Sequence, residues 1–212
     1  MHASLCVCAL VPRLATRTRL VLVIHHREDR KPTNTGRLAA KCLENSQIVV
    51  RGQASRATEP EPALVFPEGM QPVILYPAED AVPLATFAGG ERPVALVVPD
   101  GNWRQASKVR RRLAGLAGVP AVSLPDGGAS AYRLRSEPVT GGLATLEAIA
   151  RAFGVLEGKE TEAAMLRPFR AMVERTLWAR GEISADDVQD GLPAGAERHD
   201  PESGLARPVR PW

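Results

Sequence analysis

An acidic, an amide and an aromatic side chain occur together where an apolar run ends. The run at residues 94–98 is followed by Pro-Asp-Gly-Asn-Trp at residues 99–103. A carboxylate can accept a proton, an amide can donate and accept hydrogen bonds, and an indole ring can stack on a planar base. Because these groups suit a core poorly, we interpret the segment as a site. The alternative is that Asp100 caps a helix beginning near Trp103, since Asp is a preferred N-cap residue.

Positive charge is concentrated in two parts of the chain. Residues 1–57 contain ten Lys and Arg against three Asp and Glu, a net charge of +7, whereas the whole chain carries +3. The second cluster follows the apolar run and consists of Arg104, Lys108, Arg110, Arg111 and Arg112. Charge gathered in this way attracts a polyphosphate partner, because each neutralised phosphate releases counterions. A solvated, Arg-rich surface is the alternative.

Strand-like and helix-like patterns alternate along the chain. Short β-branched runs bounded by Pro, Gly or charged residues predict strands at residues 20–24, 47–50, 73–76, 94–98 and 121–124. Apolar periodicity predicts helices at 35–43, 103–116, 143–153 and 162–179, the last bent or restarted at Pro168. This alternation predicts an α/β fold with a mostly parallel sheet covered by helices on both faces. Ligands of such sheets bind beyond the carboxyl ends of the strands, where Asp100 is expected.

The length and composition fit one soluble domain. The chain has 212 residues, of which 44% are hydrophobic and 24% charged. We expect a single domain over residues 1–180 and a loosely ordered tail over 181–212, which is rich in Asp, Glu, Pro and Gly. The longest aliphatic runs are far shorter than the roughly 20 residues of a membrane helix. Three cysteines are too few for a disulfide framework, which favours the reducing cytoplasm.

Six blocks of sequence, in the same order, resemble the DTW-domain family, whose members include tRNA-uridine aminocarboxypropyltransferases. The blocks lie at residues 6–28, 34–39, 74–81, 96–106, 131–138 and 142–150. The family is related to the SPOUT-like RNA modification enzymes, which bind S-adenosylmethionine in loops at the carboxyl ends of strands. The resemblance therefore implies a SPOUT-like fold, and it is the resemblance alone that suggests a knot. It extends from about residue 5 to residue 153.

Two positions depart from the family pattern. The Asp-x-Thr-Trp motif of the family reads Asp-Gly-Asn-Trp here, so Asn102 replaces a threonine. Relatives commonly carry a Cys-x-x-Cys pair before a Cys-x-Cys, whereas this chain has Cys6 and Cys8 without the upstream pair. A tetrahedral structural zinc site needs four ligands, and two thiolates do not make one. We expect no metal site in the chain as given.

The reaction that the resemblance implies is transfer of the 3-amino-3-carboxypropyl group of S-adenosylmethionine to N3 of a tRNA uridine, releasing 5′-methylthioadenosine. In this reading Asp100 is the general base that removes the N3 proton. Asn102 holds the uracil edge or orients Asp100. Trp103 stacks on the uracil or the adenine, although a Trp at the start of a helix also suits the core.

The remaining blocks supply candidate donor and RNA contacts. We expect the following residues to bind the donor: Tyr76, Pro77, Tyr132, Leu134, Arg135, Thr145 and Glu147. The alternatives are a plain strand-to-loop turn at 76–77 and support of the helix start by Thr145 and Glu147. RNA contacts are expected from His25, Arg104, Lys108, Arg110, Arg111 and Arg112. For His25 the alternative is a satisfied polar loop.

Two other functions stay open at the level of sequence. One is an S-adenosylmethionine-dependent RNA methyltransferase, which would release S-adenosylhomocysteine instead. The other is a non-catalytic RNA-binding protein in which Asn102 marks the loss of an active site. The sequence leaves the identity of the tRNA, the modified uridine and the oligomeric state undetermined.

Overall fold

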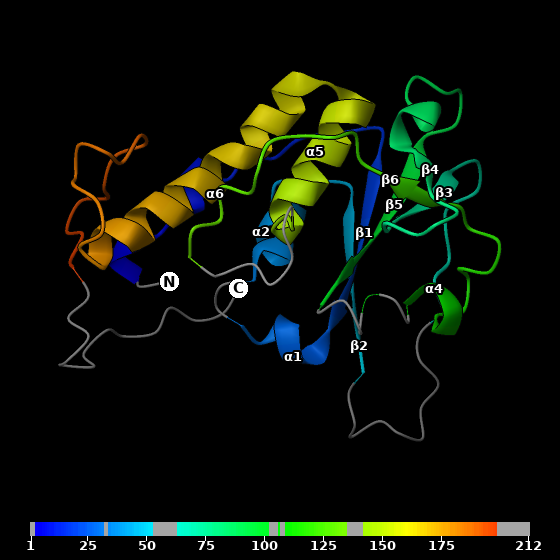
Figure 1. Cartoon of the computed structure of the whole chain (residues 1–212), viewed down its shortest axis with the longest axis horizontal. Coiled ribbons are helices and arrows are strands. Elements are labelled where there is room, and N and C mark those ends of the chain that lie inside the picture. Colours follow the sequence, from blue (N-terminus) through cyan, green and yellow to red (C-terminus); the bar gives the residue numbers. More distant parts are fainter. Residues whose placement is uncertain are drawn as a thin grey trace.

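The centre of the molecule is a parallel β-sheet (Figure 1). The computed structural model of the chain describes residues 3–31, 34–52, 63–101, 106, 109–134 and 142–198. Within these ranges six strands form one sheet in the order β2-β1-β5-β3-β6-β4, and every neighbouring pair is parallel. The strands are β1 (Arg19–His25), β2 (Ser46–Arg51), β3 (Gln71–Leu75), β4 (Val82–Pro83), β5 (Val94–Asp100) and β6 (Ala121–Ser123).

Five of these strands confirm the β-branched runs of the sequence, and their ends shift by one or two residues. The sixth strand, β4, was not predicted. It comprises two exposed residues at the edge of the sheet, so it has neither the length nor the apolar character that a pattern needs. The predicted α/β class with helices on both faces is confirmed.

Among the described residues, the last two helices are long and the others are short. They are α1 (His26–Asp29), α2 (Thr35–Lys41), α4 (Val109–Arg112), α5 (Thr145–Glu157) and α6 (Lys159–Ala179), with 3₁₀ turns at Ala3–Leu5, Cys8–Leu10 and Leu84–Phe87. The predictions at 35–43, 143–153 and 162–179 are confirmed with shifted ends. Helix α4 lies inside the predicted span 103–116, of which residues 103–105 and 107–108 lie outside the described residues.

Of the two alternatives for Pro168, the restart of the last helix is wrong, because α6 continues through this residue, and the bend stays a prediction. Pro168 removes one backbone hydrogen bond from the helix. However, it is buried together with its neighbours Met165 and Phe169. The apolar surface that this face of α6 buries outweighs the cost of the proline.

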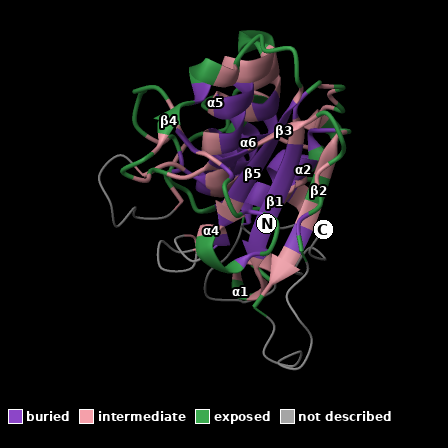
Figure 2. Cartoon of the chain, turned by 90° about the vertical axis from the view of Figure 1, so that its right-hand side faces the viewer, coloured by how far each residue is buried: buried purple, intermediate pink, exposed green. Residues whose placement is uncertain are grey.

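The two faces of the sheet carry different layers. Leu22, Leu96 and Val98 pack under α2, α5 and α6 on one face. The residues next to these in the sequence, such as Val23 and Val97, pack with α4 on the other face of the sheet. Successive side chains of a strand point to opposite faces, so each face receives alternate residues. Asp100 follows Val98 by two positions and therefore lies on the face covered by α2 and α5. Figure 1 shows the two layers, and Figure 2 shows the buried strands between them.

Strand β5 lies between β1 and β3, at a point where the chain connections diverge. The connection from β1 to β2 passes through α2 on one face, and the connection from β5 to β6 passes through α4 on the other. Neighbouring parallel strands whose connections leave on opposite faces form a crevice beyond their carboxyl ends, and this crevice is the usual ligand site of open α/β sheets. Asp100 ends β5 at that point.

The segment after α6 packs back on this helix. Val188 is buried with Leu5 and Trp178 in a small apolar cluster. The Arg175 guanidinium donates hydrogen bonds to the carbonyl oxygens of Cys6 at 2.5 Å and Gly191 at 2.9 Å, so it joins both ends of the described chain to α6. The boundary at residue 180 stays a prediction, and residues 199–212 lie outside the described residues. None of the described helices combines the length and the apolar character needed to cross a bilayer.

Candidate active site

The carboxylate of Asp100 is held by two side chains from other parts of the chain. The Asn34 amide nitrogen donates a hydrogen bond to Oδ2 of Asp100 at 2.7 Å. The Thr145 hydroxyl donates to Oδ1 at 2.6 Å. Asp100 is 9% exposed, so the two bonds form largely out of water, where hydrogen bonds to a charged group are strong. The carboxylate is therefore fixed in orientation from both sides.

Asn34 connects Asp100 to the start of α2. It is the N-cap residue of this helix, and its side-chain oxygen accepts a hydrogen bond from the backbone N–H of Arg37 at 2.8 Å. Capping uses the carbonyl oxygen of the amide, which leaves the NH₂ group to donate to Asp100. An amide carries the cap acceptor and the NH₂ donor on separate atoms, whereas a Ser or Thr hydroxyl would have to accept and donate through one oxygen.

A glycine allows α2 to approach the carboxylate. A Cβ atom on Gly36 would lie 2.8 Å from Oδ2 of Asp100 and 3.2 Å from the methyl carbons of Leu22. Real Cβ atoms essentially never come so close to another heavy atom. The absence of a side chain at this position is therefore what lets the first turn of α2 pack directly on the end of β5.

The start of α5 meets the start of α2 at the same place. Thr145 is the first residue of α5, and the next backbone N–H, that of Leu146, lies 3.4 Å from the hydroxyl oxygen of Thr35 in α2. The first turns of both helices therefore face the end of β5. Backbone N–H groups at a helix start give this region a positive potential, which favours a negative group such as Asp100.

Glu147 binds three donors of the protein itself. Its carboxylate accepts hydrogen bonds from the Ser130 hydroxyl at 2.5 Å, the Ala131 N–H at 2.7 Å and the Ala144 N–H at 2.9 Å. The side chain is buried. These contacts fix the segment 130–132 against the start of α5, which corresponds to the supporting role that the sequence left open. Donor binding by Glu147 stays a prediction.

The other candidate donor contacts are dispersed. The Tyr132 ring is buried in the apolar core, with its centroid 5.7 Å from that of Phe169, and Leu134 packs on the same cluster. Tyr76 is half-buried against the cluster on the opposite face of the sheet, and Pro77 is exposed. Of this group, Thr145 is the residue whose contact with Asp100 the structure shows. Arg135 lies outside the described residues.

The candidate RNA contacts divide into three groups. Arg110 forms two hydrogen bonds of 2.7 Å with the carboxylate of Asp80, and these bonds lower the pKa of Asp80. Arg111 and Arg112 are exposed on α4. His25 ends β1, and its Nδ1 atom accepts a hydrogen bond from the Arg27 N–H at 3.3 Å. The remaining RNA candidates, Arg104 and Lys108, lie outside the described residues. The same holds for the reaction candidates Asn102 and Trp103.

The approach of Asn34 and Gly36 to Asp100 was not predicted from the sequence. Both belong to one of the six resembling blocks, at residues 34–39, so the signal was present. Their function depends on contact with Asp100, which is 66 positions from Asn34 in the sequence. No local pattern reports a contact of that separation.

Comparison with known proteins identifies the family. The family model described as the DTW domain matches residues 1–177. The chain belongs to the DTW-domain family. A curated relative from Drosophila melanogaster, named tRNA-uridine aminocarboxypropyltransferase 2, is 29% identical over 178 residues, which cover 81% of this chain and 70% of the relative.

Further relatives carry the same type of name. The Macaca fascicularis protein tRNA-uridine aminocarboxypropyltransferase 2 is 28% identical over 80% of this chain, which spans 59% of that relative. The Arabidopsis thaliana protein tRNA-uridine aminocarboxypropyltransferase A is 26% identical over 80% of this chain and 76% of its own length. No solved structure is significantly similar to the chain.

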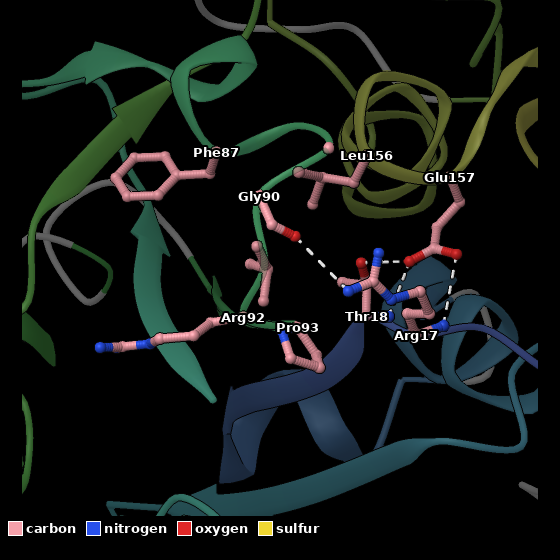
Figure 3. Close-up of a pocket in the computed structure, with 10 residues that line it drawn as sticks. Arg17, Thr18, Phe87, Gly90, Arg92, Pro93, Leu156 and Glu157 are labelled. Carbon is pink, nitrogen blue, oxygen red and sulfur yellow. Dashed lines mark hydrogen bonds between the residues drawn. The ribbon is translucent and has the colours of Figure 1, made fainter. Parts of the chain in front are cut away.

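A shallow pocket with a cavity volume of about 30 Å³ lies at the amino ends of the strands, opposite the end that carries Asp100 (Figure 3). It is lined by Arg17, Thr18 and Arg92 near the amino ends of β1 and β5, and by Glu157 at the end of α5. The Glu157 carboxylate accepts hydrogen bonds from the N–H of Thr18 at 2.7 Å and from its hydroxyl at 2.5 Å. These contacts join α5 to β1, so we assign the polar groups of this pocket a structural role in the DTW domain.

Two of the three cysteines are in contact with each other. The Cys8 N–H donates a hydrogen bond to Sγ of Cys6 at 3.3 Å. Cys42 is buried in the core, and burial raises the pKa of its thiol to about 12. Within the described part of the chain, no three His, Cys, Asp or Glu side chains are grouped closely enough to hold a metal ion.

Proposed function

We propose that this DTW-domain protein transfers the 3-amino-3-carboxypropyl group of S-adenosylmethionine to N3 of a uridine in tRNA. Three points support the proposal: the family, the names of its relatives, and a fixed carboxylate at the crevice of a parallel sheet. The observation that carries it is the pair of hydrogen bonds from Asn34 and Thr145 to Asp100. We also propose the SPOUT-like, knotted fold of the related enzymes, and a cytoplasmic location.

The reaction requires one proton acceptor. The N3 atom of uridine attacks the γ-carbon of the methionine arm, the C–S bond breaks, and its electron pair stays on sulfur to give 5′-methylthioadenosine. The new bond joins N3 to this carbon, and the N3 proton passes to the carboxylate of Asp100. The sulfonium activates each of its three attached carbons, so holding the correct carbon near N3 is the main task of the protein. Orientation of this kind is worth roughly 7–11 kcal/mol.

The two hydrogen bonds to Asp100 are compatible with its role as a base. A carboxylate has about four acceptor positions, and Asn34 and Thr145 occupy one on each oxygen. They set the direction in which the carboxylate meets a substrate. A fixed direction is an advantage, because proton transfer needs a short and aligned contact.

The other roles follow from the resemblance. Asn102 holds the uracil edge or orients Asp100, and Trp103 stacks on one of the two bases. The donor is bound by residues around the crevice, with Thr145 the one in direct contact with Asp100. Phosphates of the tRNA are bound by the basic residues after β5, which hold the RNA without reading its sequence. On α4 the exposed Arg111 and Arg112 are the proposed phosphate contacts, because Asp80 pairs with the guanidinium of Arg110.

The test is incubation of the protein with S-adenosylmethionine and bulk tRNA, followed by mass spectrometry of the nucleosides. We expect uridine that has gained an aminocarboxypropyl group, together with 5′-methylthioadenosine. Asp100→Asn should lower the rate about 10²–10⁴-fold. Asp126→Asn, an equal change at an exposed loop residue, should leave it unchanged.

Each alternative predicts a different product. Methylated nucleoside with S-adenosylhomocysteine would identify a methyltransferase. Binding of tRNA without any modified nucleoside, from folded protein and the natural tRNA pool, would identify a non-catalytic RNA-binding protein. Either outcome would refute the proposed transfer.

A further inference from the structure

We propose that His25, His26 and Arg51 form a binding site for a backbone phosphate of the RNA. The inference rests on the proposed function in one respect, which is that the macromolecular substrate is RNA. It adds a location for a phosphate contact and a dependence on pH. Arg51 was not among the RNA contacts expected from the sequence.

The cluster lies at the carboxyl ends of the strands, as Asp100 does. His25 at the end of β1 pairs in register with Arg51 at the end of β2, and Ile24 pairs with Asp100 at the end of β5. Neighbouring strands lie about 4.8 Å apart, so Arg51 and Asp100 are separated by about 10 Å along the edge. An RNA chain whose base reaches Asp100 therefore has its adjoining backbone within reach of the cluster.

Alternation along the strands assigns the cluster to the face that carries α4. His25 follows Val21 and Val23, and Arg51 follows Val49, all of which pack on the α4 face. The exposed Arg111 and Arg112 are part of α4. The carboxylate of Asp100 lies toward the other face, where Asn34 and Thr145 hold it. The basic groups are thus gathered on one side of the crevice and the proposed chemistry on the other.

Several cationic groups gather around His25. Arg27, Arg51 and His26 surround His25, and burial together with these charges lowers its pKa. Glu28 is the acidic group that acts on His25, and its carboxylate is already paired with Lys31 at 2.6 Å. An anion bound here would relieve the repulsion among the cationic groups, which is the electrostatic requirement of a phosphate site.

Two details of local geometry agree with this interpretation. The rings of His25 and His26 lie 4.6 Å apart, and the Nδ1 atom of His26 is enclosed with no hydrogen-bond partner among the residues described. An enclosed polar atom without a partner calls for an explanation, and an oxygen-rich ligand supplies one. Gly52 has a φ of +75°, and a Cβ there would lie 2.8 Å from Nε2 of His25, so glycine lets the chain pass close over this ring.

Protonation of His25 should therefore be coupled to RNA binding. A phosphate near the ring stabilises the imidazolium, so binding raises the pKa of His25 and takes up a proton. The affinity for RNA then increases as the pH falls, by at most tenfold per pH unit for one proton. The charged groups that set this response are His26, Arg27 and Glu28 beside His25, and Arg51 from β2.

The experiment measures binding of fluorescently labelled tRNA to the full chain, without S-adenosylmethionine, from pH 5.5 to pH 8. The wild type should bind more tightly at low pH. His25→Asn keeps a side-chain acceptor for the Arg27 N–H but does not titrate, so its affinity should vary less with pH. Arg51→Gln should weaken binding about fivefold at 0.15 M salt and reduce the salt slope by about one.

The control is Arg92→Gln, which removes one charge near the pocket at the amino ends of the strands and should leave tRNA binding unchanged. Equal pH responses of wild type and His25→Asn, or an Arg51→Gln effect no larger than that of the control, would overturn the phosphate site and leave the proposed transfer intact. Absence of any tRNA binding would overturn both. Thermal melts of each variant verify that it is folded.

Discussion

The hydroxyl group of Thr145 lies 2.6 Å from Oδ1 of Asp100, although 45 positions separate the two residues in the sequence. This bond ties the first turn of α5 to the end of β5. The matching bond from Asn34 ties α2 to the other carboxylate oxygen. Asp100 is consequently the point where three elements meet, and its orientation depends on all three.

Removal of the Thr145 hydroxyl should loosen this arrangement. Thr145→Val keeps the shape of the side chain and deletes the donor, whereas Thr145→Ser keeps the donor. Hydrogen bonds to charged groups contribute about 1.5–3 kcal/mol, so Thr145→Val should lower the transfer rate about 10–100-fold. Thr145→Ser should stay within a few-fold of the wild type. Single-turnover rates with saturating donor measure the effect, and equal rates for the two variants would show that the hydroxyl does not position Asp100.

Gly36→Ala should destabilise the protein, although Gly to Ala in a helix usually stabilises by about 0.5–1 kcal/mol. The new Cβ would lie 2.8 Å from Oδ2 of Asp100 and displace a carboxylate that two hydrogen bonds hold. We expect a loss of about 1–2 kcal/mol in the free energy of unfolding and a lower transfer rate. Gly128→Ala is the matched control, because no atom lies within 4 Å of its Cβ position. Urea denaturation of both variants makes the comparison.

Glu147→Ala should lower the free energy of unfolding by about 3 kcal/mol, since it leaves the donors of Ser130, Ala131 and Ala144 without their partner. Glu147→Gln, which keeps one acceptor oxygen, should lose less. Denaturant titration measures both. A Glu147→Ala protein of normal stability but weaker binding of S-adenosylmethionine would instead assign this residue to the donor.

The stability of the free protein should depend on pH through His25. Burial and the neighbouring positive charges hold the pKa of this histidine below its ordinary value of 6.5, so the folded state favours the neutral ring. The corresponding stabilisation is present above pH 6.5 and is lost as the pH falls through the lowered pKa. Relative to His25→Asn, the wild type should become less stable between pH 7 and pH 5. Melting temperatures of both proteins at matched pH test this, and parallel curves would contradict it.

Much of the fold follows from local patterns in the sequence. Five β-branched runs identify five strands, and their alternation with helical patterns implies a parallel sheet covered on both faces. The position of Asp100 at the end of a strand also follows, because the apolar run stops there. These features depend on neighbouring residues within one element, and a period of two or 3.6 residues records them directly.

The tertiary structure alone decided the partners of these residues. Asn34 and Gly36 belong to the surroundings of Asp100 because α2 packs across the end of β5. Tyr132, expected at the donor site, lies in the core against Phe169, and Arg110 is paired with Asp80. The sequence by itself determined which segments form strands and helices and where the acidic group stands. The contacts between segments arose when the layers packed, because they join residues tens of positions apart that no local periodicity connects.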